Sequence, residues 1–65
     1  MKEVGTRIKQ LRKEKGLTQE QLAAEFGVSV QAVSKWETDQ SVPDMNNLLA
    51  LAREFSVSVA ELTET

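Results

Sequence analysis

A short pattern that starts helices occurs three times in this chain and constrains its fold more than any other feature. An apolar residue precedes Ser or Thr, and another apolar residue follows four positions later, over residues 17–22, 28–33 and 57–62. The hydroxyl caps the first helical turn, and the two apolar residues pack as a hydrophobic staple. Gln21 and Glu61 complete a capping box in the first and third copies, whereas Ala32 cannot in the second.

The second copy also resembles a strand, because Val28, Val30 and Ala32 alternate with polar residues and two of the three are β-branched. The cap resolves this ambiguity. Val28 precedes Ser29 and folds back on the helix, whereas Val30 is the first helical residue and points elsewhere. A helix is therefore predicted here.

The remaining helices follow from apolar residues at helical spacing and from signals at the helix ends. We predict an all-α fold of five helices, over residues 4–15, 18–26 and 29–38, then one capped by Asp44 and a short one from Ser58. Gly27 lies in the tight turn between the second and third helices, as in a helix-turn-helix. The apolar residues expected in the core are Val4, Ile8, Leu11, Leu22, Ala23, Phe26, Val33, Trp36, Leu48, Leu51, Ala52 and Phe55.

Composition excludes several classes of site. The 65 residues include no Cys and no His, which argues against zinc fingers, soft-metal sites, disulfides and imidazole-assisted nucleophiles. We expect no metal and no cofactor. Asp39 and Asp44 are better explained as loop and cap residues than as an acid–base pair, so no enzyme is expected. The sequence shows neither a signal peptide nor a membrane span, and we expect a cytoplasmic protein.

Charge is unevenly distributed along the chain. The net charge is −2, but residues 1–38 carry seven basic and five acidic residues, a sum of +2. Residues 39–65 carry one basic and five acidic residues, a sum of −4. A basic surface is therefore possible only in the first half.

Two segments carry a family resemblance. TQEQLAAEFGVSVQAVSKWE resembles the helix-turn-helix of the Cro/CI (Xre-type) repressors, and PDMNNLLALAREFSVSVAELT resembles the fourth and fifth helices of that family. The likeness covers roughly residues 4–63. It implies a single compact lambda-repressor-like DNA-binding domain over residues 1–65, with the helix-turn-helix at about 18–38. The implied function is sequence-specific transcription regulation on double-stranded DNA.

The resemblance implies that the third helix enters the major groove, and a helical wheel indicates the same outward stripe. The expected base-reading residues are Val30, Gln31, Ser34 and Lys35. Gln can pair with adenine, Lys can donate to guanine, and Val can contact a thymine methyl group. The alternative is an ordinary solvated helix face.

Further roles come from the same resemblance. An Arg at position 12 pairs in relatives with the Glu that ends the third helix, here Glu37, and lies close to a phosphate. We expect Arg12 to act chiefly as a structural brace. Gln19 follows the cap at the positive end of the second helix, where it could hold a phosphate or be an ordinary surface residue. The residues expected near the DNA backbone are Arg12, Thr18, Gln19, Ser29 and Thr38.

The loop after the third helix departs from the family pattern, since residues 38–42 contain no basic side chain and Asp39 stands where relatives often have Gly. We expect a homodimer on a palindromic operator, paired through the fifth helix and the outer side of the fourth, where Leu49 and Val59 are spare. The rival interpretation is an antitoxin-like or other protein-interaction module, suggested by the acidic second half.

Overall fold

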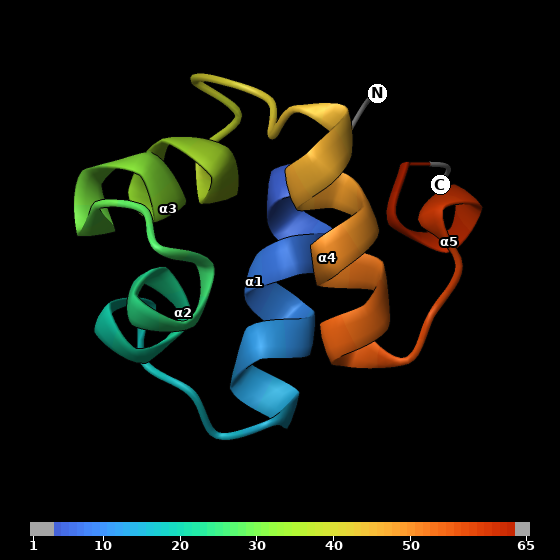
Figure 1. Ribbon diagram of the computed structural model, residues 1–65, viewed down its shortest axis with the longest axis horizontal. Coiled ribbons are helices and arrows are strands. Elements are labelled where there is room, and N and C mark those ends of the chain that lie inside the picture. Colours follow the sequence, from blue (N-terminus) through green and yellow to red (C-terminus); the bar gives the residue numbers. More distant parts are fainter. Residues whose placement is uncertain (1–3, 64–65) are drawn as a thin grey trace.

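The protein is described by a computed structural model over residues 4–63, and all regular elements in this range are α-helices (Figure 1). They are α1 (Val4–Glu14), α2 (Gln19–Phe26), α3 (Val30–Glu37), α4 (Met45–Phe55) and α5 (Val59–Thr63). The all-α prediction is confirmed. The ends predicted for the first three helices lie within one residue of those observed, partly because cap residues had been counted as helical. No helix in residues 4–63 is long and apolar enough to cross a membrane.

Helix α1 lies at the centre of the domain. It packs against α3 on one side and against α4 and α5 on the other, while α2 packs against α3. The pair α2–α3 therefore lies to one side of α1, as seen at the left of Figure 1. The principal extents of the chain are 25 × 23 × 20 Å.

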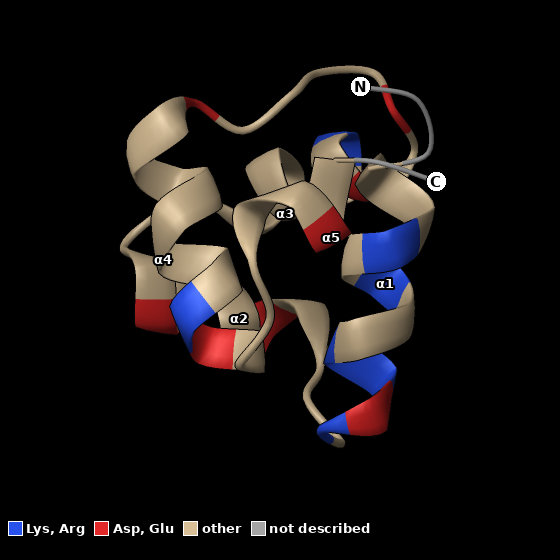
Figure 2. Ribbon diagram, turned by 90° about the vertical axis from the view of Figure 1, so that its right-hand side faces the viewer, with Lys and Arg blue, Asp and Glu red and all other residues tan. Residues whose placement is uncertain are grey.

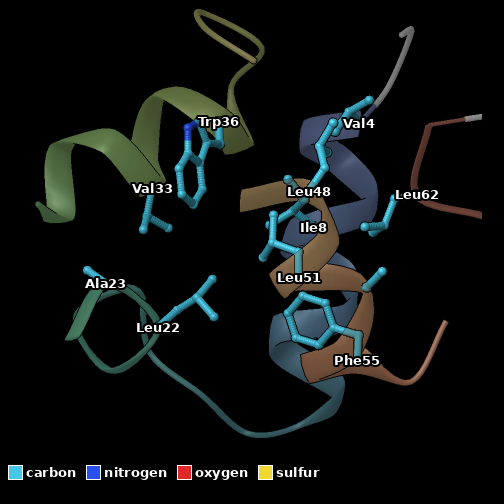
Figure 3. Packing of buried hydrophobic residues seen from close by; sticks show 11 residues of the cluster. Val4, Ile8, Leu22, Ala23, Val33, Trp36, Leu48, Leu51, Phe55 and Leu62 are labelled. Atoms are coloured by element: carbon cyan, nitrogen blue, oxygen red, sulfur yellow. The ribbon is translucent and has the colours of Figure 1, made fainter. Parts of the chain in front are cut away.

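The core is formed where these helices meet (Figure 3). The buried apolar residues are Val4, Ile8, Leu22, Ala23, Val33, Trp36, Leu48, Leu51, Ala52, Phe55 and Leu62. Leu11 and Phe26, also predicted to face inward, are half-buried and pack against this cluster. Trp36 meets Phe26 edge to face, with ring centroids 6.4 Å apart and an interplanar angle of 71°. Trp36 thus joins α3 to α2, in agreement with the packing role predicted for it.

The predicted helix starts have the expected hydrogen bonds. Thr18 Oγ1 accepts from the Gln21 amide at 3.0 Å, and Gln21 Oε1 accepts from the Thr18 amide at 2.8 Å. Ser58 and Glu61 form the same reciprocal pair, at 3.0 and 2.8 Å. Ser29 Oγ accepts from the Ala32 amide at 3.1 Å. The helical interpretation of residues 28–33 is therefore confirmed.

Helix ends depend on residues with positive φ. Gly27 ends α2 with φ 65°, which glycine adopts without a Cβ penalty. Ser56 ends α4 in the same left-handed conformation, with φ 56°. The Val57 amide then donates to the Ala52 carbonyl at 2.9 Å, which closes the end of the helix. No feature of the sequence around Ser56 marked it as left-handed, because Gly or Asn is the usual residue there.

Replacing Ser56 by glycine should stabilise the domain. The left-handed conformation costs a residue with a Cβ about 1–2 kcal/mol, and part of that gain is offset by the greater freedom of Gly in the unfolded chain. We expect Ser56→Gly to raise the free energy of unfolding by about 0.5–1 kcal/mol in urea titrations. Ser41→Gly, at an exposed loop residue without positive φ, is the matched control and should lower it. A loss of stability in Ser56→Gly would contradict this account.

Gly5 allows α1 to approach the end of α3. A Cβ built on Gly5 would lie against the Trp36 carbonyl oxygen and 2.8 Å from the Glu37 carbonyl oxygen. Both obstacles are backbone atoms, which cannot rotate away as a side-chain end can. A glycine in the first turn of a helix was a visible signal of such a contact, but it did not identify the partner.

Gly5→Ala is expected to destabilise the protein although Ala is the better helix former by about 1 kcal/mol. The added methyl group must push α1 away from α3, and overpacking of this kind costs about 1–3 kcal/mol. Urea unfolding followed by the fluorescence of Trp36 would measure the change. An increase in stability would mean that the approach of the two helices is looser than described.

Candidate nucleic-acid interface

The turn between α2 and α3 is fixed by backbone hydrogen bonds. The Gly27 amide donates to the Ala24 carbonyl at 3.4 Å, and the Val28 amide donates to the Ala23 carbonyl at 3.1 Å. Val28 is half-buried and packs against the core. With the Phe26–Trp36 contact, these bonds hold the two helices in one relative orientation.

The outward face of α3 carries three of the four predicted base-reading residues. Gln31 and Lys35 are exposed, and Ser34 is half-buried. None of their side chains forms a hydrogen bond or ion pair with another residue of the described range 4–63. Their polar groups are therefore available to a ligand.

Val30 is more buried than the prediction implied. It is half-buried and packs against the core, whereas the helical wheel had been taken to place it opposite Val33. Residues three apart on a helix are neighbours on one face, so Val30 must lie beside the buried Val33. It can offer at most the edge of its side chain to a partner.

Two of the cap residues lie at helix N-termini as expected. Thr18 and Ser29 each accept one amide hydrogen bond with the side-chain oxygen, and each hydroxyl can still donate. Thr38 is arranged differently, because its hydroxyl donates to the Ser34 carbonyl at 2.9 Å. In this conformation Thr38 has no hydroxyl proton to offer to a phosphate.

A buried polar cluster lies behind the helix-turn-helix. Arg12 Nε donates to Glu37 Oε2 at 2.6 Å, and Arg12 Nη2 donates to Glu37 Oε1 at 3.2 Å. Arg12 Nη1 donates to the Leu17 carbonyl at 2.8 Å, and Gln19 Nε2 donates to Glu37 Oε1 at 3.0 Å. The side chains of Arg12 and Glu37 are only 10% and 2% exposed. Glu37 thereby links α1, the start of α2 and the end of α3.

This geometry favours the bracing role of Arg12. Its guanidinium points inward to Glu37 and to the Leu17 carbonyl, and little of it reaches the surface. Gln19 keeps one amide proton for an outside acceptor, because Glu37 takes only the other. The bond between Gln19 and Glu37 had not been anticipated, since eighteen positions separate the two residues in the chain.

The acidic residue of the loop after α3 is turned toward α1. Asp39 has φ 60°, the left-handed conformation expected for it. Its Oδ1 accepts from the Gly5 amide at 3.0 Å. The carboxylate therefore lies at the N-terminal end of α1, where the helix dipole favours negative charge. The sequence had marked Asp39 only as a residue that stands where relatives often have Gly.

Basic side chains are concentrated on α1, and Lys35 is the basic residue of α3 (Figure 2). Arg7, Lys9 and Lys13 lie on α1, the first half-buried and the other two exposed. Among residues 4–63, no group of three or more acidic side chains is placed to hold a metal ion. The outward face of α3 thus offers one cation and two neutral polar side chains.

Comparison with known proteins identifies this arrangement. A helix-turn-helix family model matches residues 8–62, from the middle of α1 to the end of the core. The chain belongs to the Cro/CI (Xre-type) helix-turn-helix family. Members of this family are DNA-binding transcriptional regulators, which agrees with the predicted fold and function.

Curated relatives support the assignment. The chain is 45% identical over 60 residues to the HTH-type transcriptional activator BcrR of Enterococcus faecalis, covering 92% of this chain but 29% of that protein. It is 43% identical over 59 residues to the uncharacterized HTH-type transcriptional regulator y4dJ of Sinorhizobium fredii, covering 91% and 77%. The cryptic phage CTXphi transcriptional repressor RstR of Vibrio cholerae is 36% identical over 56 residues, covering 86% and 50%. The chain therefore spans about a third to three quarters of the length of these relatives.

Removing Arg12 should be far more damaging than removing an exposed lysine. Arg12→Ala leaves Glu37 buried without its partner, and breaking a buried pair costs about 3–5 kcal/mol. Lys15→Ala is the matched control. Lys15 meets Glu54 at 3.4 Å with side chains 45% and 26% exposed, and such pairs contribute about 1 kcal/mol or less. Thermal unfolding followed by circular dichroism would compare the two variants; equal losses would contradict a bracing role for Arg12.

Proposed function

We propose that the family's helix-turn-helix regulates transcription in this protein by reading a specific double-stranded DNA sequence with α3 in the major groove. The observation that carries the proposal is that Gln31 and Lys35 are exposed on α3 and that their side chains form no hydrogen bond or ion pair with another described residue. The opposite face of the same helix is held in the core by Val33 and Trp36. The helix is thus anchored on one side and chemically available on the other.

The exposed groups suit base edges. A Gln carboxamide can form two hydrogen bonds with adenine, and a Lys ammonium can donate to guanine O6 and N7. The Ser34 hydroxyl can donate or accept. We assign base reading to Gln31, Lys35 and Ser34, with Val30 limited to an apolar contact at the edge of the groove.

Contacts with the DNA backbone are assigned to the helix N-termini. Amides in the first turn of a helix bind phosphate well, because they lack partners within the helix and lie at its positive end. The hydroxyls of Thr18 and Ser29 and the second amide proton of Gln19 lie at these ends. Most of these donors are uncharged, so few counterions should be released and the salt dependence of binding should be shallow.

One domain is too small to contact a long site. Its largest extent is 25 Å, whereas successive major grooves on one face of DNA are about 34–36 Å apart. We therefore infer two copies on a palindromic or near-palindromic operator, each with one α3 helix in a groove. Of the two residues predicted to be spare for pairing, Leu49 is exposed, whereas Val59 is half-buried against the core. We propose that the protein acts in the cytoplasm, where it would meet its operator.

The first test is selection of binding sites from random duplex DNA, followed by fluorescence anisotropy on the recovered sequence. Gln31→Ala should weaken binding about 5- to 150-fold, since a bidentate base contact contributes about 1–3 kcal/mol of discrimination. Gln10→Ala is the matched control, because Gln10 is exposed on α1, away from the helix-turn-helix, and should leave affinity unchanged.

Two results would contradict the proposal. If Gln31→Ala and the parent chain bind the DNA with equal affinity, α3 does not read the bases in the major groove as proposed. Failure to enrich any sequence at low salt, with the chain folded, would favour the rival antitoxin-like or protein-interaction module. In that case the acidic second half of the chain, with a sum of −4 over residues 39–65, becomes the first surface to search for a partner.

A further inference from the structure

The side-chain amide at the start of α2 is held in place by the end of α3. Gln19 is the first residue of α2 and is half-buried. Its Nε2 donates to Glu37 Oε1 at 3.0 Å, so the carboxamide turns toward Glu37 and not freely into solvent. A long polar side chain in a first helical turn usually samples several rotamers. Here one rotamer is selected before any ligand arrives.

Glu37 also determines which end of the Gln19 amide faces inward. An ionised carboxylate only accepts hydrogen bonds, whereas a carboxamide has a donor end and an acceptor end. The donor end of Gln19 must therefore face Glu37. One proton of this NH2 group is used, and the other remains for an acceptor outside the domain.

The negative charge of Glu37 is shielded from an approaching phosphate. Its side chain is buried, and Arg12 Nε and Nη2 donate to its two oxygens at 2.6 and 3.2 Å. The pair has no net charge, so its field falls off faster with distance than that of a lone carboxylate. Glu37 can thus orient a donor toward DNA without strongly repelling the DNA.

Two backbone amides adjoin this fixed side chain. They belong to Gln19 and Glu20, and no carbonyl or side chain of residues 4–63 accepts from them. The next amide, that of Gln21, is taken by the Thr18 hydroxyl. Phosphate oxygens bind unpartnered amides of this kind. Because the exposed Glu20 carboxylate opposes a phosphate in the same turn, binding depends on donors that need no further ordering.

We propose that Glu37 is a positioning residue for the DNA backbone, which holds the Gln19 amide where it donates to a phosphate beside the two unpartnered amides. The proposal rests on the function proposed above and adds to it a residue that itself lies in the interior. Immobilising a long side chain on binding costs a factor of about 2 to 12 in affinity, and Glu37 removes this cost in advance. Since Glu37 also ends α3, it joins the backbone contact to the base-reading helix.

The test is a double-mutant cycle of DNA affinity, measured by anisotropy on the selected sequence and on an unrelated duplex. Gln19→Ala should weaken binding to both duplexes alike, by about 10- to 150-fold, as expected for a lost hydrogen bond to a charged group. The salt dependence should stay the same, because a neutral donor releases no counterion.

Glu37→Gln keeps the shape of the side chain but no longer fixes the Gln19 amide, since it can donate as well as accept. It should weaken binding about 2- to 12-fold more in the parent chain than in Gln19→Ala. Its effect on Arg12 is common to both backgrounds and cancels in this comparison. Gln10→Ala, at an exposed residue of α1, is the control and should show no coupling with Glu37→Gln.

A second measurement applies even if Glu37→Gln does not fold. In the parent chain only one proton of the Gln19 NH2 group is bonded to Glu37, so its two NMR signals should exchange with water at different rates. The two protons of the exposed Gln40 amide are the control and should exchange alike. Adding the unrelated duplex should shift the more rapidly exchanging proton of Gln19.

Additive effects of Gln19→Ala and Glu37→Gln in folded variants overturn the positioning role, and the proposed function still stands if Gln31→Ala weakens binding to the selected sequence. Equal exchange of the two Gln19 protons also overturns the role, as does a Gln19→Ala effect confined to the selected sequence. Coupling on the unrelated duplex when no sequence is enriched would refute specific reading and support the positioning role. A parent chain that binds no duplex at low salt overturns both.

Discussion

The buried ion pair between Arg12 and Glu37 holds the first three helices in register. Two charges removed from water are tolerable only when their hydrogen-bonding groups are satisfied. Here the Leu17 carbonyl and the Gln19 amide complete the network, so the pair involves α1, the turn after it, α2 and α3. Because each of these hydrogen bonds needs a specific partner, the network adds to the apolar core a restriction on how the first three helices can pack.

A second contact between α1 and α3 involves backbone atoms. Gly5 lets α1 reach the carbonyl groups at the end of α3, and Asp39 then binds the Gly5 amide from the loop. The C-terminal end of α3 is thus anchored to α1 by a close approach and a hydrogen bond. The outward residues of α3 take no part in this anchoring. The helix-turn-helix consequently has an inner side built for rigidity and an outer side left open.

Local signals in the sequence were sufficient for the secondary structure but not for the polar contacts. Thr18 and Ser58 were identified as caps because a cap and its partners lie within four residues of one another. The bonds of Gln19 to Glu37 and of Asp39 to Gly5 span eighteen and thirty-four positions. Such contacts depend on how the helices are packed, which no short pattern encodes. Val30 was misplaced for a simpler reason, since it lies three residues before the buried Val33.

Since the side chains of Gln31 and Lys35 form no hydrogen bond or ion pair with another described residue, the residues proposed to meet bases can change without disturbing the scaffold. Substitutions at such exposed, unbonded positions usually alter stability by no more than about 0.5 kcal/mol. A duplicated copy of this domain could therefore acquire a new target sequence through a few substitutions while the fold is preserved. The same separation makes the domain a practical scaffold for building regulators with chosen operators.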